Sequence, residues 1–329
     1  MAALRKGDGE QPAAAGPESH PHSLAAPVLL LAGPTGVGKS EIALLLAERL
    51  RGELISVDSM QVYRGMDLGT AKPSLAERAR VPHHLIDVAD ITEPFDAAQF
   101  ARLAHQTVAD IQQRGRVPIL CGGTGFYFKA FLEGLGEAPP SDAALRARLE
   151  KEPLSDLLRE LAERDPATYA KIDRQNPRRV IRAIEVIRLT GKLFSSQRAE
   201  GKFPAFQSQP GSRFFGLSRV PGDLWKRIDA RVDEMFRLGL VAETEDLLKR
   251  GLARNKTAMQ ALGYRQVVEY LAGARPLPET IALVKIRTRQ FAKRQMTWFR
   301  NQARLDWTNI DPEAGNEVIV NQLALSSFP

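Results

Sequence analysis

Several features that would assign a chain to a common class are scarce or missing from this sequence. Only one cysteine, Cys121, occurs in 329 residues, so a disulfide framework and a zinc site built from cysteines are both excluded. No apolar run approaches the about 18 residues that are needed to span a bilayer. We therefore expect a protein of the reducing cytoplasm without a membrane segment.

Acidic residues are fewer than basic ones. The chain has 46 Lys and Arg against 39 Asp and Glu, a net charge of +7. An excess of this size is typical of a polyanionic partner, although it also serves simple solubility. Residues 1–26 hold Pro, Ala, Gly and Ser without a periodic apolar face, which predicts a disordered extension. This stretch has neither the apolar core of a secretory signal nor the acid-poor composition of a transit peptide.

Short apolar runs alternate with helical patterns in the first half of the chain. This alternation predicts an α/β fold in which helices flank a parallel sheet, as in P-loop NTPases. The expected strands are VLLLAG (28–33), ELISVD (53–58), HLIDV (84–88), VPILCGG (117–123) and, later in the chain, FFGLSR (214–219). The expected helices of this half are residues 40–50 and 96–115.

The pattern changes after residue 138, because only helical periods follow as far as Leu193. We predict an all-helical insertion at residues 139–204. The core would then comprise residues 27–138 and 205–310, with a helical C-terminal part, and residues 311–329 would form a tail.

The octapeptide GPTGVGKS at residues 33–40, here called the phosphate loop, lies between an expected strand and an expected helix. Its glycines let backbone N–H groups turn inward, Lys39 supplies a charge to phosphate oxygens, and Ser40 supplies a hydroxyl for Mg²⁺. Two sequence features that would identify the ligand of such a loop are missing. VPILCGG ends in glycines and not in the Mg²⁺-binding Asp of an NTPase, and the dinucleotide fingerprint is not matched. The motif therefore predicts a polyphosphate ligand without saying which one.

Two further loops follow expected strands, at the edge where parallel sheets bind ligands. Asp58 begins DSMQ (58–61), where its carboxylate could bind a metal, act as a base or cap a turn. GGTG (122–125) places Thr124 near the same crevice. The paired histidines of PHHLID (82–87) fit loop packing or hydrogen bonding better than a metal site, because other Cys or His ligands are lacking.

Together these segments resemble the tRNA dimethylallyltransferases, also called tRNA isopentenyl transferases. The resemblance continues in RRVIRAIEV (178–186), RIDARVDEMFRLGLVAE (227–243), QALGYR (260–265) and AKRQMTWFR (292–300), and it covers about residues 28–302. It implies transfer of a dimethylallyl group from dimethylallyl diphosphate to N6 of the adenosine 3′ to the anticodon of tRNA, with Mg²⁺ as cofactor. The partners would be the anticodon stem-loop and the prenyl diphosphate, and a monomer is expected.

The resemblance also implies roles for individual residues. The expected catalytic residues are Asp58, Thr35 and Thr124, with Asp58 as the acceptor of the amine proton. Diphosphate would be bound by Gly33, Pro34, Thr35, Gly36, Val37, Gly38, Lys39, Ser40 and Arg231, and the metal by Ser40. The expected tRNA contacts are Asp58, Ser59, Met60, Gln61, Thr124, Arg146, Gln175, Asn176, Pro177, Arg178, Arg179, Gln260, Ala261, Leu262, Gly263, Tyr264 and Arg265.

A basic segment near the C-terminus favours a nucleic-acid partner. Seven Lys and Arg and no acid occur between Lys285 and Arg304, and Lys285, Arg289 and Lys293 share one helical face. Phosphate contact is the preferred interpretation of these charges. For Phe291 and Trp298 we prefer a place in the core.

Three other functions stay open at this point. A small-molecule P-loop kinase would explain the phosphate loop, but neither the basic segment nor the helical insertion. A related enzyme that uses free AMP as the acceptor would not need the basic faces. A non-catalytic RNA-binding module would not need the carboxylate of Asp58.

Overall fold

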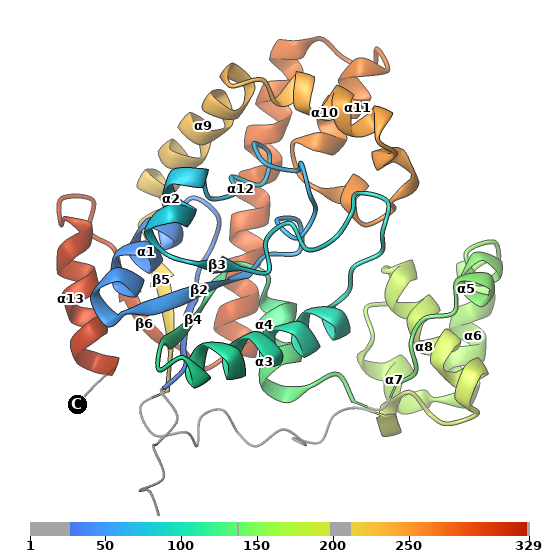
Figure 1. Ribbon diagram of the computed structural model, residues 1–329. Coiled ribbons are helices and arrows are strands. Elements are labelled where there is room, and N and C mark those ends of the chain that lie inside the picture. Colours follow the sequence, from blue (N-terminus) through green and yellow to red (C-terminus); the bar gives the residue numbers. More distant parts are fainter. Residues whose placement is uncertain (1–26, 137, 198–211, 328–329) are drawn as a thin grey trace, which may run out of the picture.

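The core of the molecule is a parallel β-sheet (Figure 1). The computed structural model describes residues 27–136, 138–197 and 212–327, so the predicted disorder of residues 1–26 lies outside the described residues. The strand order is β3–β2–β4–β1–β5–β6, and neighbouring strands are all parallel. The strands are β1 Leu29–Ala32, β2 Gly52–Val57, β3 His83–His84, β4 Val117–Gly122, β5 Arg213–Ser218 and β6 Asp306–Asn309. The predicted parallel sheet is confirmed.

Helices cover both faces of this sheet, because its strands are apolar on both sides. Leu29 and Leu31 of β1 face a cluster with α1 (Lys39–Leu50) and α13 (Asn316–Ser327). Leu30 and Ala32 face the opposite cluster with α3 (Ala97–Gln113) and α4 (Gly125–Glu133). This three-layer arrangement fixes the carboxyl ends of the strands at one edge, where the three predicted loops follow.

The third strand is much shorter than predicted. We expected HLIDV (84–88), but β3 comprises only His83–His84. The backbone then turns into the left-handed region at Leu85 (φ 59°) and Asp87 (φ 58°), which a strand does not allow. Salt bridges hold the Asp87 carboxylate at 2.6 Å from Lys72 and 2.8 Å from Arg78, and they draw this segment out of the sheet.

The C-terminal segment belongs to the core, whereas we expected a tail at residues 311–329. β6 lies before this tail and was not among the expected strands, and it extends the sheet beyond β5; α13, within the expected tail, then packs against α1. Ile319, Val320 and Leu323 of α13 are buried in the cluster with β1 and α1. The spacing of these apolar residues is that of a helix with one buried face, a signal that our sequence analysis did not use.

The region expected as an insertion is helical and has a hydrophobic cluster of its own. Its helices are α5 Ala143–Leu149, α6 Leu154–Arg164, α7 Pro166–Lys171, α8 Pro177–Thr190 and the 3₁₀ turn η1 Ser195–Gln197. The cluster includes Leu149, Leu161, Val180 and Ile184. These helices project from the sheet and its covering helices on one side (Figure 1). Residues 198–204 of the expected insertion lie outside the described part of the chain.

The helices between β5 and β6 form a second group that begins beyond the carboxyl edge of the sheet, and the last of them runs back along the sheet (Figure 1). They are α9 Pro221–Arg237, α10 Leu240–Lys249, α11 Tyr264–Leu271 and α12 Leu277–Gln302, with the turns η3 Leu252–Arg254 and η4 Ala258–Gln260. The short helix α2 (Leu75–Arg80) precedes β3. The long helix α12 packs against α9, α11 and α4, and so connects this group to the site described next.

Candidate active site

The phosphate loop has the backbone that anion binding requires. Gly36 (φ 81°) and Gly38 (φ 103°) are both in the left-handed region, where side chains are strained. Gly38 is the N-cap of α1, and no side chain caps this end of the helix. The first N–H groups of α1 and the positive end of its dipole are therefore left for an anion.

Lys39 is held next to these N–H groups. Its ammonium donates a hydrogen bond to the carbonyl oxygen of Pro34 at 2.9 Å, so the side chain folds back over the loop. Burial lowers the pKa of Lys39 from 10.5 to about 8, and the nearby Arg231 guanidinium also lowers it, whereas the Asp58 carboxylate opposes the shift. A bound diphosphate would restore the charged form by supplying negative charge.

The carboxylate of Asp58 follows β2 and lies within the electrostatic reach of both Lys39 and Arg231. Its Oδ1 accepts the backbone N–H groups of Met60 at 2.8 Å and Gln61 at 3.2 Å. Asp58 therefore caps a turn, as one of the predicted alternatives holds, and is fixed by it. Within the described residues both of these hydrogen bonds reach the same oxygen, which leaves Oδ2 to accept a proton.

Hydrogen bonds join the three loops at the carboxyl edge. The Thr124 hydroxyl accepts the Ser59 N–H at 3.2 Å, although Thr124 is the N-cap of α4 and could have capped that helix instead. The Thr35 N–H donates to Oε1 of Gln295 at 2.9 Å. The structure thus brings together the three residues expected to be catalytic, with Gln295 from α12 among them.

Arginines of α9 and of the turn between β5 and α9 approach the phosphate loop. Burial lowers the pKa of Arg231, while Asp58 opposes this shift. Arg219 donates to the Val37 carbonyl at 2.8 Å, and Arg227 donates to the Gly36 carbonyl at 3.0 Å. Sequence reasoning missed Arg219 and Arg227. Arg219 directly follows β5, so the strand-end rule that selected Asp58 could have found it.

The donor set suits Mg²⁺ bound mainly by its substrate. Among the described residues no group of three or more His, Cys, Asp or Glu is placed to hold a metal. Ser40 is exposed at the start of α1, next to the anion-binding N–H groups. Mg²⁺ commonly uses few protein ligands together with phosphate oxygens and water. The paired histidines have other partners, since His83 contacts the Val81 carbonyl and His84 contacts Glu53, each at 2.7 Å.

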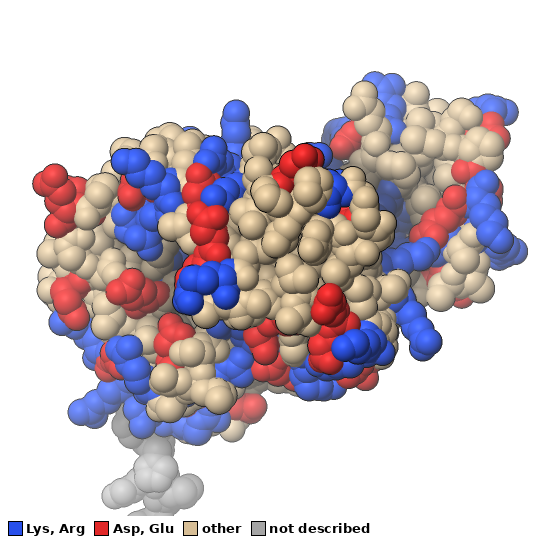
Figure 2. Space-filling view, turned by 90° about the horizontal axis from the view of Figure 1, so that it is seen from above, with Lys and Arg blue, Asp and Glu red and all other residues tan. Residues whose placement is uncertain are grey.

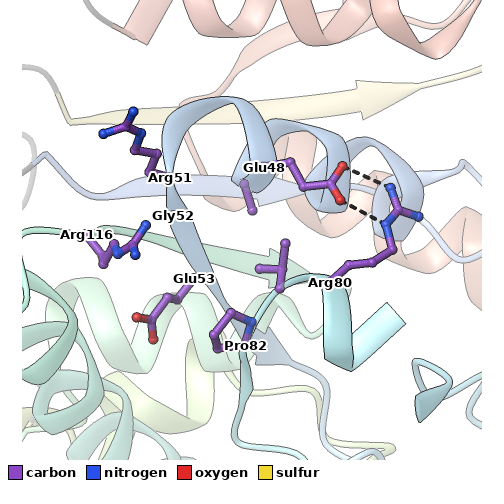
Figure 3. A pocket seen from close by; sticks show the side chains of 9 residues that line it. Glu48, Arg51, Gly52, Glu53, Arg80, Pro82 and Arg116 are labelled. Carbon is purple, nitrogen blue, oxygen red and sulfur yellow. Dashed lines mark hydrogen bonds and ion pairs between the residues drawn. The ribbon is translucent and has the colours of Figure 1, made fainter. Parts of the chain in front are cut away.

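A cavity of about 330 Å³ lies at the opposite, amino edge of the sheet (Figure 3). It is lined by residues around the start of β2 and β4, including Arg51 and Arg116. Arg80 closes one side through two hydrogen bonds of 2.9 Å to Glu48. None of the predicted site residues lines this cavity, so it is separate from the candidate active site.

Comparison with known proteins identifies the family. A model described as IPP transferase matches residues 61–302. The chain belongs to the IPP transferase family. It is 41% identical over 303 residues to a tRNA dimethylallyltransferase of Pelotomaculum thermopropionicum, covering 91% of this chain and 95% of that protein. It is also 47% identical over 286 residues to a tRNA dimethylallyltransferase of Halorhodospira halophila, covering 85% of this chain and 91% of that protein.

Solved structures of the IPP transferase family share the fold. The tRNA isopentenylpyrophosphate transferase of Bacillus halodurans matches with a TM-score of 0.66 and 38% identity, over 91% of this chain and 96% of that one. A eukaryotic dimethylallyltransferase, described as acting on tRNA, matches with a TM-score of 0.77 and 28% identity, over 91% of this chain and 78% of that one. The predicted family and P-loop-like fold are confirmed.

Two of the segments expected to bind tRNA meet in this IPP transferase. Arg178, on α8, donates to the side chain of Gln260 in η4. A cavity of about 410 Å³ opens beside this contact and is lined by Arg178, Ala253, Lys256, Met259, Arg265, Val268 and Glu269. Figure 2 shows Lys and Arg side chains on both sides of the junction between the projecting helices and the rest of the molecule. The neighbouring Gln175, Pro177 and Arg179 are also exposed, and Asn176 caps α8.

Several other residues that were expected to contact tRNA are buried or paired with other residues of the protein. Tyr264 is fully buried, and its hydroxyl bonds Glu243 at 2.5 Å and the Gly69 N–H at 3.1 Å. Ala261 and Gly263 are buried as well, whereas Leu262 is half-buried. Arg146 lies 2.6 Å from the buried Glu185, which also binds Arg182. In this conformation Tyr264 shapes the loop at residues 67–70 and offers no surface to RNA.

The basic face of α12 differs from the prediction at Lys285 and Arg289, whereas Lys293 on the same face is exposed. Lys285 lies 2.6 Å from Asp233, and Nε of Arg289 lies 2.9 Å from Oδ1 of Asp229, both on α9. These two charges pair with acids from another part of the chain, so they join α12 to α9 and are not a free surface for phosphate. Phe291 is 36% exposed, which the expected core position does not allow, while Trp298 packs against the core.

The lowered pKa of Lys39 predicts a pH dependence of diphosphate capture. Its folded pKa of about 8 lies below the ordinary 10.5, so the charged form is present below pH 8 and is lost as the pH rises through 8. We expect kcat/KM for the prenyl diphosphate to fall above about pH 8, because kcat/KM reports groups of the enzyme form that captures this substrate. Initial rates at saturating tRNA between pH 6 and pH 9.5 would measure it. A profile that stays flat to pH 9.5 would contradict the lowered pKa of Lys39.

Proposed function

We propose that this IPP transferase moves a dimethylallyl group from dimethylallyl diphosphate to N6 of the adenosine 3′-adjacent to the anticodon, position 37 of tRNA. The products are N6-(dimethylallyl)adenosine and diphosphate. The observation that carries the proposal is the meeting of Lys39, Asp58 and Arg231 at one edge of the sheet. Cations for a leaving diphosphate and a carboxylate for a proton are the two requirements of this alkyl transfer.

The leaving group is served by the phosphate loop. N6 attacks C1 of the dimethylallyl group, the C1–O bond breaks, and the electron pair departs with the diphosphate. The N–H groups of the loop, Lys39 and Arg231 stabilise this charge as it develops. Burial strengthens these interactions, because field screening by water is reduced. Ser40 would hold Mg²⁺, which when bound adds a further positive charge to the diphosphate.

The acceptor amine N6 is a poor nucleophile, because its lone pair is delocalised into the adenine ring. Asp58 takes the proton that N6 loses, and its turn through Met60 and Gln61 fixes the direction from which it acts. The hydroxyls of Thr35 and Thr124 lie on the loops to either side. Of the remaining phosphate-loop positions, Gly36, Val37 and Gly38 supply backbone N–H groups to the diphosphate in this proposal, and Gly33 and Pro34 shape the start of the loop around it.

The tRNA would lie across the junction of the projecting helices and the core. A base within an anticodon loop is unstacked at low cost and can reach an edge site. Gln175, Asn176, Pro177, Arg178, Arg179, Gln260, Leu262 and Arg265 are our proposed contacts at this junction, with Ser59, Met60 and Gln61 nearer the reacting amine. Arg146, Ala261, Gly263 and Tyr264 stay in the proposal as supports of these contacts, since they are paired or buried.

The oligomeric state of the enzyme and its compartment are also part of the proposal. Since the three loops and Arg231 come from one chain, we propose that the enzyme works as a monomer in the cytoplasm. Among the described residues no helix is both long enough and apolar enough to cross a bilayer.

The test is a direct product assay. The protein is incubated with dimethylallyl diphosphate, Mg²⁺ and an anticodon stem-loop that has an adenosine 3′ to the anticodon. Mass spectrometry should find one added C5 unit, located on that adenosine after nuclease digestion. A stem-loop with guanosine at this position is the matched control and should stay unmodified. Folded protein that gives no adduct would refute the proposal, and equal activity on free AMP would point to a different acceptor.

A further inference from the structure

Gln295 is a buried polar side chain in the middle of α12, directly behind the loops of the active site. It is only 8% exposed. Its Oε1 accepts the Thr35 N–H at 2.9 Å, and its Nε2 donates to the Gly123 carbonyl at 2.9 Å. One side chain therefore connects the phosphate loop to the GGTG loop, and it uses both ends of its amide to do so.

The pairing of β1 with β4 joins the two loops at their base, and Gln295 adds a side-chain link beyond the ends of these strands. A Cβ added to Gly123 would lie 2.3 Å from Nε2 of Gln295, so the amide packs directly against the loop backbone. One turn further along α12, Trp298 packs in the same way on Gly125, where an added Cβ would lie 2.1 Å from the indole ring. Gly123 and Gly125 thus have a packing reason, which is close approach of α12, whereas Gly122 packs against the backbone of Val57 in β2.

The Thr35 N–H is committed to Gln295 and is not free for a phosphate oxygen. The diphosphate must then rely on the loop from Gly36 onward, which Arg219 and Arg227 hold through the carbonyls of Val37 and Gly36. Gln295 thereby links Thr35 to the loop that carries Thr124. The hydrogen bond between Ser59 and Thr124 connects this loop in turn to the DSMQ loop.

We propose that Gln295 is a positioning residue that sets the distance between the Thr35 and Thr124 loops, and with it the alignment of the acceptor amine, the allylic carbon and Asp58. This inference rests on the proposed function, because it concerns how that reaction is aligned. A misplacement of about 1 Å in an active site can cost about 10²-fold in rate. Gln295 therefore acts on turnover and not on the capture of either substrate.

The first test is Gln295→Met, which keeps the length of the side chain and removes both hydrogen bonds. We expect kcat to fall by about 10- to 100-fold, with KM for both substrates within about threefold of the wild-type values. Gln290→Met is the matched control, since Gln290 is exposed on the same helix and touches neither loop. Wild-type kcat in Gln295→Met, or an equal loss in Gln290→Met, would overturn the inference.

The second test, Gln295→Glu, separates positioning from folding. A protonated Glu offers one acceptor and one donor, as Gln does. An ionised Glu has no donor, so it would place a second acceptor oxygen against the Gly123 carbonyl oxygen. Burial raises the pKa of a carboxyl group. The ratio of Gln295→Glu to wild-type kcat should therefore rise as the pH falls from about 9 to about 6. A ratio that is flat over this range would contradict the role, even if Gln295→Met failed to fold.

A readout without catalysis separates this inference from the proposed function. Amide hydrogen exchange of the Thr35 N–H should be faster in Gln295→Met than in the wild type and in Gln290→Met, because its acceptor is gone. Unchanged exchange would refute the contact itself. An inactive wild-type enzyme would refute the proposed function, whereas an active wild type with an equally active Gln295→Met would refute only the role of Gln295.

Discussion

Asp58→Asn should lower kcat by about 10²- to 10⁴-fold while tRNA binding stays within about threefold of wild type. The amide oxygen can still accept the N–H groups of Met60 and Gln61, so the turn that fixes this residue is preserved. What is lost is an oxygen able to take the proton of the acceptor amine. Single-turnover rates with radiolabelled prenyl diphosphate measure the chemistry, and filter binding with an anticodon stem-loop measures the tRNA.

The control for this variant is Asp110→Asn, an exposed aspartate on α3 outside the site. It should have wild-type kcat. If Asp58→Asn turns over within a fewfold of wild type, proton acceptance by Asp58 is wrong, and its role is limited to shaping the turn. If the variant loses tRNA binding to the same extent as kcat, the carboxylate serves recognition and not the proton transfer.

Lys39→Met should lower kcat/KM for dimethylallyl diphosphate by about 10²- to 10³-fold, with the loss divided between KM and kcat. The ammonium binds the diphosphate in the ground state, and it binds it more strongly as charge develops on the departing oxygen. Methionine keeps an unbranched stem that fits between Pro34 and the start of α1, so the fold should be retained. Steady-state kinetics with saturating stem-loop measure both parameters.

The control is Lys249→Met, an exposed lysine at the end of α10, which should behave as wild type. A Lys39→Met enzyme with unchanged kcat and raised KM would limit Lys39 to substrate binding. Unchanged kcat and KM together would contradict the assignment of the phosphate loop to the diphosphate, and a search for another phosphate site would have to follow.

Much of the sheet was predictable because β1, β2, β4 and β5 are short apolar runs with a turn after each, whereas β6 (DWTN) is mostly polar and was not predicted. The position of Asp58 at the end of β2 followed from the same rule, since the carboxyl ends of parallel strands share one edge. HLIDV fails as a strand because Asp87 is held by Lys72, 15 residues away, and by Arg78. Composition and alternation do not report such a contact.

The basic segment shows a second limit of sequence patterns. Lys285, Arg289 and Lys293 lie on one face of α12 in the sequence, and a run without acids favoured a surface for phosphate. The acids that neutralise Lys285 and Arg289 come from α9, 52 and 60 residues earlier. A charge pattern within one helix cannot show what another helix places against it.

Taken by itself, the sequence determined the phosphate loop, the strand-end carboxylate and the family, because each depends on residue types at fixed local spacing. The tertiary structure alone decided which groups act together. It buried Tyr264, paired Lys285 and Arg289 of α12 with acids of α9, packed α13 against α1, and placed Gln295 between loops that are 260 and 172 residues away in the chain. The physical reason is that hydrogen bonds and ion pairs between distant segments form only after the chain has folded, so their partners have no common signal in the sequence.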